Sequence, residues 1–345
     1  MRPKVAVIYN EPLPSRYTDM GEGKAIAGVL DETAAVRRAL EELEYPVCEV
    51  SLKPPLEQAW ETLNDLRTDV VFNLFEGFDG RAETEAMVAN ILAALGLPYT
   101  GCPAYVLSLA LDKVRSKSII ESMGVETPKC QVIRPGTLQS FSLTYPCIVK
   151  PVGEDASHGI SEESVVNDYG ALESQVKKIS QLFGGKALVE EFVDGREFNV
   201  TVMGAREAVV LPVSEITYSL PSDKPKLLTF DAKWDLQSMY YRGTRAVCPA
   251  VVDDDLRSRI NDMALNIYKL LGCRGYARVD MRMNQSGRVM VLEVNPNPDI
   301  SPESGAARQA AAAGMSFRQF IERILIYALE GVSSDASCTV HDWSG

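Results

Sequence analysis

The chain lacks the cysteine pairs and histidine clusters that build disulfide frameworks and zinc sites. It has 345 residues, of which seven are cysteine and only two are histidine, His158 and His341. No two cysteines form a CxxC pair and their number is odd, so both a disulfide framework and a Cys/His zinc site are disfavoured. We therefore expect the protein in a reducing compartment, the cytoplasm.

Long hydrophobic runs and an excess of basic residues are also missing. No apolar run approaches the roughly 18 residues of a membrane-spanning helix, and residues 1–10 lack the pattern of a secretory signal. Lysine and arginine number 35 against 47 aspartate and glutamate, which gives a net charge of −12. A surface of that sign repels phosphate, so we expect no nucleic-acid partner and no membrane partner.

The composition that remains is typical of a globular protein. Hydrophobic residues make up 46% and charged residues 24%, and the length corresponds to two or three domains. The first hundred residues alternate between strand and helix patterns, which predicts a parallel sheet covered by helices. The expected elements are strands at 5–9, 47–52 and 69–74 and helices at 32–43 and 84–95.

The rest of the chain divides into a small and a larger α+β region. A turn-rich segment at 97–103 ends the first region, and a helical stretch at 105–123 follows it. No internal repeat interrupts this order. The boundaries that we expect are 1–104, 105–194 and 195–332, followed by a polar tail at 333–345.

The most informative segment is a predicted β-hairpin at 276–295, which turns at 284–287. If Met283 pairs with Arg288 across this turn, side chains that alternate along each strand separate into a polar and an apolar face. The polar face holds Arg278 opposite Glu293, with Asp280 and Asn295, and the apolar face holds Val279, Met281, Leu292 and Val294.

One cation, two carboxylates and an amide on one face make a candidate Mg²⁺ site. Hard cations prefer oxygen ligands, and Mg²⁺ usually takes one or two carboxylates plus substrate phosphates. The arginine would then stabilise a developing anion. Spacing alone equally allows a solvated face with an ordinary ion pair, and a three-residue loop would divide the set between the two faces.

A second signal is a lysine followed by a loop of small residues. Lys150 ends a predicted strand, and the loop at 151–160 contains glycine and few hydrophobic residues. Backbone N–H groups and Ser157 in such a loop can hold a phosphate, although small-residue loops near a lysine are common. The segment at 190–193 ends another predicted strand, where its backbone could hold a flat base, and Glu197 follows it.

Several short motifs form an ordered set that is more specific than any one of them. They are LPYTG at 97–101, DK at 112–113, IVKP at 148–151, VEEF at 189–192, GREF at 195–198, AKW at 232–234, LGCRG at 271–275, ARVD at 277–280 and EVNPNP at 293–298. From about residue 97 to 320 the chain thereby resembles ATP-grasp ligases of the D-alanine–D-alanine ligase family. The resemblance before residue 97 is weaker.

The resemblance implies an α/β, three-domain ATP-grasp fold. It has an N-terminal parallel α/β domain, a small α+β central domain and a larger C-terminal α+β domain. The implied cofactors are ATP and Mg²⁺ or Mn²⁺. The residues implied for ATP are Lys113 and Lys150 at the phosphates, Ser157, Gly159 and Lys233 over the γ-phosphate, Glu190, Glu191 and Val193 at the adenine, and Glu197 at the ribose.

The resemblance also implies residues for the metal, the chemistry and the substrates. Asp280, Glu293 and Asn295 would bind Mg²⁺. Arg278 would stabilise an acyl phosphate and the tetrahedral adduct, with Ser157 and Lys233 as further catalytic residues. Arg278, Asp299 and Ser304 would face the substrates, and Ser304 would hold the carboxylate of the attacking amino acid.

The chain departs from the family at four places, mostly around the substrates. The family turn after the first strand carries a glutamate that holds the ammonium of the first D-alanine, whereas residues 10–15 read NEPLPS here. The residues that could replace that glutamate are Glu11, Asp19 and Glu22; the other departures are Ala156 for a serine, Trp234 for a tyrosine and Asp299 for a glycine. Asp299 would favour an ammonium beside it and disfavour a carboxylate.

The function implied is an ATP-dependent carboxylate–amine ligase that joins amino acids or small peptides. One alternative is D-alanine–D-alanine ligase itself, serving peptidoglycan synthesis. The other is an ATP-binding pseudo-enzyme that acts as a regulatory module. The expected partners are small-molecule substrates, and a homodimer is a further expectation because homodimers are common in the family.

Overall fold

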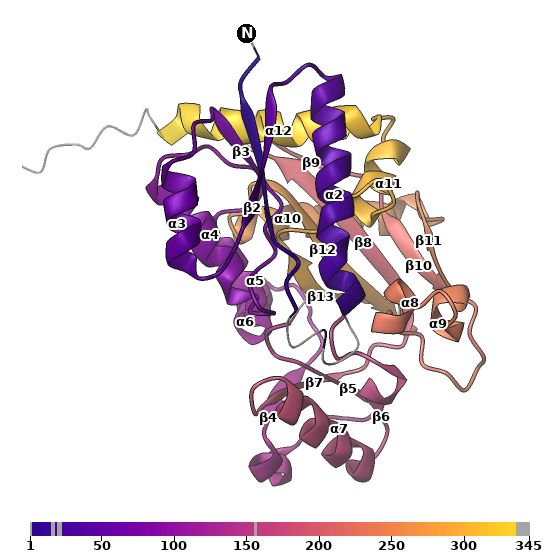
Figure 1. Ribbon diagram of the computed structural model, residues 1–345. Coiled ribbons are helices and arrows are strands. Elements are labelled where there is room, and N and C mark those ends of the chain that lie inside the picture. The colour runs from indigo at the N-terminus through magenta and orange to yellow at the C-terminus, as the bar shows by residue number, and fades with distance from the viewer. Residues whose placement is uncertain (1, 15–17, 19–22, 155–156, 336–345) are drawn as a thin grey trace, which may run out of the picture.

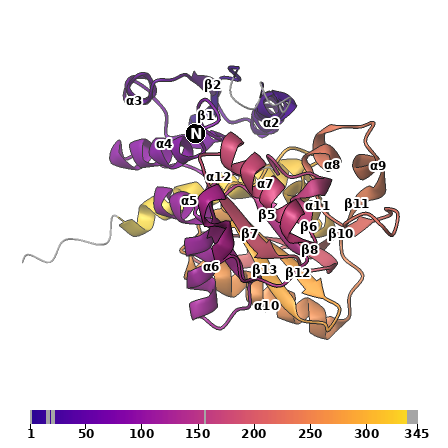
Figure 2. The same ribbon diagram turned by 90° about the horizontal axis from the view of Figure 1, so that it is seen from below.

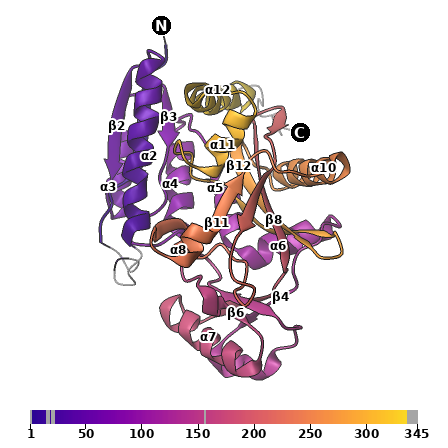
Figure 3. The same ribbon diagram turned by 90° about the vertical axis from the view of Figure 1, so that its right-hand side faces the viewer.

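The computed structural model describes residues 2–14, 18, 23–154 and 157–335. Asp19, Glu22 and Ala156, which the sequence analysis singled out, lie outside the described residues, as does most of the polar tail. The described elements form three sheets, which Figure 1 shows together with their helices. In Figure 3 the N-terminal sheet and the largest sheet lie side by side, with the smallest sheet below both.

The N-terminal sheet is parallel, as the alternation of strands and helices predicts. Its strand order is β2-β1-β3. The strands are β1 (Val5–Asn10), β2 (Val47–Leu52) and β3 (Val70–Asn73), and the helices are α2 (Gly23–Glu42), α3 (Leu56–Asn64) and α4 (Glu83–Ala94). The helix predicted at 32–43 begins earlier, at Gly23, and this extension places about two and a half more helical turns beside the carboxyl end of β1 (Figure 1).

Two short helices connect the N-terminal region to the largest sheet. They are α5 (Ala104–Leu111) and α6 (Lys113–Ser122). The continuous helix expected at 105–123 is broken at Asp112, whose backbone is not helical (φ −82°, ψ 85°) and whose carboxylate accepts the backbone N–H of Arg115 at 3.0 Å. Both helices pack against β13 of the largest sheet, and α5 also packs against α4. The break at Asp112 brings Lys113 to the start of a helix, beside that sheet.

The smallest sheet is antiparallel and has the strand order β4-β7-β5-β6. Its strands are β4 (Cys130–Ile133), β5 (Cys147–Lys150), β6 (Val165–Val166) and β7 (Ala187–Glu191). The helix α7 (Tyr169–Leu182) covers one face, and the 3₁₀ helices are η1 (Pro135–Ser140) and η2 (Glu162–Ser164). These elements share a separate hydrophobic core that includes Val149, Val176 and Val189.

The largest sheet has the strand order β11-β10-β8-β12-β13, and β9 pairs with β8. Its strands are β8 (Gly195–Gly204), β9 (Ala208–Val210), β10 (Ser214–Tyr218), β11 (Thr244–Val247), β12 (Gly275–Asn284) and β13 (Val289–Asn295). The helices are α8 (Phe230–Trp234), α9 (Met239–Gly243), α10 (Asp254–Leu270), α11 (Gly305–Ala312) and α12 (Phe317–Asp335). Figure 2 views these layers from the smallest sheet.

One hydrophobic core joins the N-terminal region to the largest sheet. Phe75 and Val88 of the former belong to the same buried cluster as Val279 and Met281 of the latter. The helix α12 packs against both β3 and β12. Among the described residues no helix has the length and apolar character needed to cross a membrane. Because they share this core, the N-terminal region and the largest sheet keep a fixed position relative to each other.

The break between α5 and α6 leads to a local stability prediction. Replacing an N-cap aspartate with alanine costs about 1 kcal/mol, which corresponds to about fivefold faster local opening. We therefore expect Asp112→Ala to accelerate hydrogen exchange of the amides of residues 115–118 by about this factor. Asp112→Asn is the control, because asparagine also caps helices. Equal exchange in the Asp112→Ala variant and the unaltered protein would show that the cap is not needed.

Candidate active site

The hairpin between β12 and β13 turns differently from the sequence expectation. Met283 lies opposite Val289, and the N–H of Asn284 donates to the carbonyl of Arg288 at 2.9 Å. The loop therefore has three residues, 285–287, and ends on Gly287 with a φ of 79°. This is the usual geometry of a three-residue loop, which needs a left-handed residue at its end. The predicted pairing of Met283 with Arg288 is wrong.

A β-bulge compensates for the odd loop. Pairing steps from Met281–Val291 to Asp280–Glu293, so Leu292 has no partner. Without this extra residue Glu293 would face Val279 and point into the core, because a shift of one residue reverses every side chain. The bulge thus confirms the expected shared face of Arg278, Asp280, Glu293 and Asn295, although Arg278 lies opposite Asn295 and not Glu293. Leu292, expected on the apolar face, lines the cavity instead.

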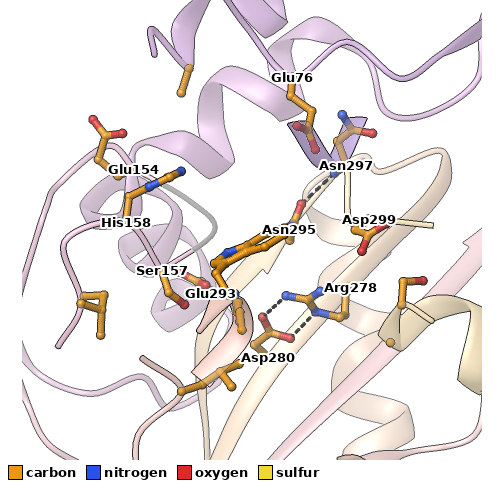
Figure 4. Close-up of a pocket in the computed structure, with 18 of the residues that line it drawn as sticks. Glu76, Glu154, Ser157, His158, Arg278, Asp280, Glu293, Asn295, Asn297 and Asp299 are labelled. Atoms are coloured by element: carbon orange, nitrogen blue, oxygen red, sulfur yellow. Dashed lines mark hydrogen bonds and ion pairs between the residues drawn. The ribbon is translucent and has the colours of Figure 1, made fainter. Parts of the chain in front are cut away.

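That face forms the floor of a cavity of about 1320 Å³ between the three sheets. Figure 4 shows part of it, with Arg278, Glu293 and Asn295 around its centre. The predicted site residues that line it are Lys113, Lys150, Ser157, Glu197, Lys233, Arg278, Asp280, Glu293, Asn295, Asp299 and Ser304. The predicted residues outside its lining are Gly159, Glu190, Glu191 and Val193.

Glu293 is surrounded by cations. Lys113 Nζ lies 3.6 Å from its Oε2. Burial acts to raise the pKa of Glu293, but the charges of Lys113, Lys150, Arg278 and Lys233 lower it to about 2. The carboxylate is therefore ionised at neutral pH. Arg278 and Lys150 also pair with the carboxylates of Asp280 and Glu190, so the four cations exceed these three carboxylates by one positive charge, a surplus that suits the phosphates of a nucleotide.

Arg278 and Asp280 form a close pair on the same strand. The Nε of Arg278 donates to Oδ1 of Asp280 at 2.7 Å, and Nη2 donates to Oδ2 at 2.8 Å (Figure 4). Burial raises the pKa of Asp280 above its ordinary value, although Arg278 opposes this shift. A carboxylate has about four acceptor positions, so this fork leaves Asp280 free to accept a further cation.

Lys233 reaches the cavity from α8, whose first turn is capped by Thr229. Burial and the charge of Arg278 lower the pKa of Lys233. The neighbouring Phe230 ring lies between His158 and Trp234, with centroids 5.6 Å and 6.3 Å away. The N–H of Phe230 also donates to the carbonyl of Ile160 at 3.0 Å. The loop that carries Lys233 and the loop that carries Ser157 are therefore joined over the cavity.

The small-residue loop needs left-handed backbone at two positions. Ser157 has a φ of 64° and Gly159 a φ of 72°. A Cβ at Gly159 would lie 2.6 Å from Cε2 of Phe183, which explains the glycine independently of any ligand. Ser157 lines the cavity and Gly159 packs behind it. Gly159 therefore shapes the loop, whereas Ser157 presents its hydroxyl to the cavity (Figure 4).

Glu190 contacts lysines in the interior. Its carboxylate lies 2.7 Å from Lys150 Nζ and 3.2 Å from Lys117 Nζ, and it is 1% exposed. Burial acts to raise the pKa of Glu190, but the two lysines lower it. Lys117 belongs to none of the residue roles expected from the sequence. Its place in the same helix as Lys113, four residues later, was the available signal.

The backbone expected to hold a flat base is partly engaged. The N–H of Glu191 donates to the carbonyl of Lys129 at 2.9 Å, and the carbonyl of Val193 accepts from Nη1 of Arg282 at 2.8 Å. Arg282 also donates to Oε2 of Glu197 at 2.6 Å, as does the hydroxyl of Tyr218. Arg282 follows Arg278 and Asp280 at two-residue spacing, so strand alternation could have placed it on the cavity face.

Comparison with known proteins agrees with this geometry. The family model described as "D-ala D-ala ligase C-terminus" matches residues 119–326. A D-alanine–D-alanine ligase of Desulforudis audaxviator is 30% identical over 302 residues, which cover 86% of this chain and 92% of the relative. The chain belongs to this family. It is an ATP-dependent ligase of the ATP-grasp fold, a class of enzyme that forms C–N bonds.

A second relative and two solved structures extend the comparison. An uncharacterized protein of Sinorhizobium fredii is 37% identical over 256 residues, covering 74% of this chain and 73% of the relative. The D-Ala:D-Ser ligase VanG of Enterococcus faecalis covers 95% of this chain and all of its own, with a TM-score of 0.72 and 22% identity. A D-alanine–D-alanine ligase of Bacillus anthracis complexed with ATP covers 97% and 99%, with a TM-score of 0.74 and 20% identity. Because these two solved structures are only 22% and 20% identical to this chain, the comparison with them establishes its fold.

The Glu190 ion pairs lead to a pH-dependent stability prediction. Removing one partner of a buried pair costs about 3–5 kcal/mol, because the remaining charge is left uncompensated. The pKa of Glu190 is lowered on folding, so its contribution exists above the unfolded pKa of about 4.5 and disappears as the pH falls below it. We expect Glu190→Gln to lower the free energy of unfolding at pH 7 and to approach the unaltered protein in acid.

Denaturant unfolding at several pH values measures this difference. The matched control is Glu191→Gln, since Glu191 is the next residue on the same strand and forms no ion pair among the described residues. Its effect should stay within about 0.5 kcal/mol. Equal losses in both variants, or a Glu190→Gln effect that does not change with pH, would contradict the assignment.

Proposed function

We propose that this chain activates the carboxylate of an amino acid or small peptide as an acyl phosphate and joins it to an amine. ATP supplies the phosphoryl group, and ADP and phosphate are released. The observation that carries the proposal is the surplus of positive charge around Glu293. Glu293 lines the same cavity as Arg278, Asp280 and Asn295. We place the reaction in the cytoplasm, and the homodimer stays a prediction.

The chemistry suits these residues. A carboxylate is a poor electrophile because its oxygen is a poor leaving group. Transfer of a phosphoryl group to that oxygen makes an acyl phosphate, an amine then attacks the carbonyl carbon, and phosphate leaves. Phosphoryl transfer needs mainly positioning and positive charge, which Lys113, Lys150, Lys233 and Arg278 supply. Arg278 lies on the floor of the cavity, where it can stabilise the oxyanion of the tetrahedral adduct.

The residues present fit a divalent cation that accompanies ATP. Asp280, Glu293 and Asn295 offer two carboxylates and an amide on one face, the hard oxygen donors that Mg²⁺ or Mn²⁺ prefers. Within the described part of the chain, no three His, Cys, Asp or Glu side chains gather as a metal cluster. This set therefore depends on Asn295 and on substrate phosphates for its remaining ligands. When bound, the ion would neutralise phosphate charge during transfer.

The nucleotide would lie between the smallest and the largest sheet. We propose that Lys113 and Lys150 hold its phosphates, that Ser157 and Lys233 cover the γ-phosphate and that Glu197 faces the ribose. Glu190 would orient Lys150, because its carboxylate is already engaged by two lysines. The adenine would then lie against the backbone of residues 190–193, with Glu191 and Val193 contributing main-chain atoms, and Gly159 would shape the phosphate loop.

The reactive acyl phosphate needs protection from water, and two loops provide a cover. They are the described residues 157–161 of the loop after β5 and residues 218–241. Phe230 and Ile160 connect them by a backbone hydrogen bond, and Lys224 forms an ion pair with Glu162 at 2.6 Å. A closed cover of this kind excludes water from the intermediate and completes the site only when both loops are in place.

The substrates are the open part of the proposal. We propose that Ser304 and the start of α11 face the carboxylate of the attacking amino acid and that Asp299 faces a cationic group. D-Alanine–D-alanine ligation in peptidoglycan synthesis is the second candidate, favoured by the name of the D. audaxviator relative. The third candidate function is that of an ATP-binding regulatory module. Such a protein would bind the nucleotide but would not turn it over.

The first test is ADP release from Mg·ATP with L- and D-amino acids, singly and in pairs, with products identified by mass spectrometry. We expect release that requires an acid and an amine and gives an amide product. D-Alanyl-D-alanine as the sole product would establish the second candidate. Bound ATP without release for any pair would contradict ligase activity on amino acids.

The second test addresses Glu293. We expect Glu293→Gln to reduce kcat by at least about a hundredfold, because this carboxylate is one of the groups that would hold the divalent cation at the phosphates and a neutral amide would hold it more weakly. Its circular dichroism spectrum should stay unchanged, since the substitution is nearly isosteric. The control is Glu126→Gln, whose carboxylate pairs with Arg288 at the outer end of the same hairpin. Normal turnover in Glu293→Gln would remove this carboxylate from the site.

A further inference from the structure

Arg282 is a buried arginine on the cavity face of β12. It follows Asp280 by two residues, so alternation along the strand places both side chains on one face, and both line the cavity. Arg282 is 3% exposed. Burial acts to lower its pKa, but Glu197 and Tyr218 raise the pKa above its ordinary value. The guanidinium therefore stays charged in the interior, where it needs partners for its donors.

The donors of Arg282 reach three separate segments. Nη1 donates to the carbonyl of Val193, which follows β7, at 2.8 Å. Nε and Nη2 both donate to Oε2 of Glu197, which lies directly opposite on β8, at 3.1 Å and 2.6 Å. Nη2 also donates to the carbonyl of Lys226 in the covering loop 218–241. One side chain thus joins the backbone proposed for the adenine, the carboxylate proposed for the ribose and the cover of the cavity.

The protein engages the two oxygens of Glu197 to different extents. Oε2 accepts the two donors of Arg282 and also the hydroxyl of Tyr218 at 2.6 Å. Burial and the charge of Glu197 raise the pKa of Tyr218 well above its ordinary value, so its hydroxyl keeps the proton that it donates. Among the described residues no group donates to Oε1 of Glu197. Because a carboxylate oxygen accepts about two hydrogen bonds, Oε1 is available to the hydroxyls of a ligand.

Glu197 would have a competing partner if Arg282 did not hold it. Burial lowers the pKa of Lys233, and the charge of Glu197 is among those that oppose this shift. A carboxylate released from the guanidinium would therefore be drawn toward Lys233. An arginine fork fixes both the distance and the plane of the carboxylate that it binds, which a single ammonium does not. The orientation of Glu197 thus depends on Arg282.

We propose that Arg282 is a positioning residue for the nucleotide: it holds Oε2 of Glu197 so that Oε1 accepts the ribose hydroxyls. Its bond to Lys226 ties this arrangement to the closed cover. The inference rests on the proposed ATP-dependent function and assigns the residue that makes the site select a ribonucleotide. The ligand class is a nucleoside diphosphate or triphosphate with free ribose hydroxyls, and a nucleotide without them loses the contact that Arg282 supports.

Calorimetric titration with Mg·ADP and with Mg·2′,3′-dideoxy-ADP tests this proposal without turnover, because ADP has no γ-phosphate to transfer. We expect the unaltered full-length protein to bind ADP about tenfold or more tightly than the dideoxy analogue, as for hydrogen bonds to a charged group. Arg282→Met should lower this ratio to about two or less by weakening ADP alone. A merely structural role would weaken both ligands equally, or reduce the fraction of binding-competent protein, and leave the ratio unchanged.

Two further variants keep the test decisive if Arg282→Met does not fold. Arg282→Lys keeps the charge but not the fork, and Tyr218→Phe removes one donor to Glu197 without altering a charge. Each should lower the ratio by about threefold. The matched control is Arg196→Met, which should leave the ratio unchanged. Arg196 forms the same kind of fork, with Glu215 and with both bonds at 2.7 Å, but it does not line the cavity.

The outcomes separate this proposal from the ligase function. Equal affinity for ADP and the dideoxy analogue in the unaltered protein, or an unchanged ratio in the variants of Arg282 and Tyr218, would overturn the role of Arg282 and leave the ligase function standing. No binding of Mg·ADP by the unaltered protein would overturn both. The expected ratios without ADP release from ATP for any substrate pair would support the role of Arg282 and refute the ligase function.

Discussion

The β-bulge at Leu292 is the constraint on which the site depends. The turn of the β12–β13 hairpin has an odd number of residues, which by itself would place Glu293 in the core opposite Val279. The unpaired residue Leu292 reverses the alternation of side chains once more, so that Glu293 and Asn295 face the cavity. The acidic floor of the cavity thus results from two irregularities that cancel.

Charge in the site is arranged at a cost to stability. Four cations surround Glu293, and Lys117 and Lys150 share the buried Glu190. Burial lowers the pKa of Lys117 and of Lys233, and the charges of Glu190 and Glu293 respectively oppose that shift. Phosphate oxygens would supply the negative charge that the protein does not, and binding and stability are thereby coupled.

The sequence predicts the parts of this arrangement that follow from local periodicity. Alternation along β12 and β13 identified the polar face, and α4 lies where the helical pattern at 84–95 placed it. Loop length and the bulge could not be predicted, because both are decided by how the strands fit their neighbours. Glu32, Arg282 and Tyr218 were missed for a related reason. Each acquires its role from a partner elsewhere in the chain, which is Ile300 for Glu32 and Glu197 for both Arg282 and Tyr218.

The two ends of the cavity carry charged side chains of opposite sign. Lysines and Arg278 gather over the largest sheet, whereas Glu32, Glu76 and Asp299 gather under α2. Because phosphates are anionic, the nucleotide that we propose for this cavity would lie at its cationic end. Among the described residues these carboxylates come from α2 and from the segments after β3 and β13, so the acidic end joins the N-terminal region to the part of the chain that the family model matches.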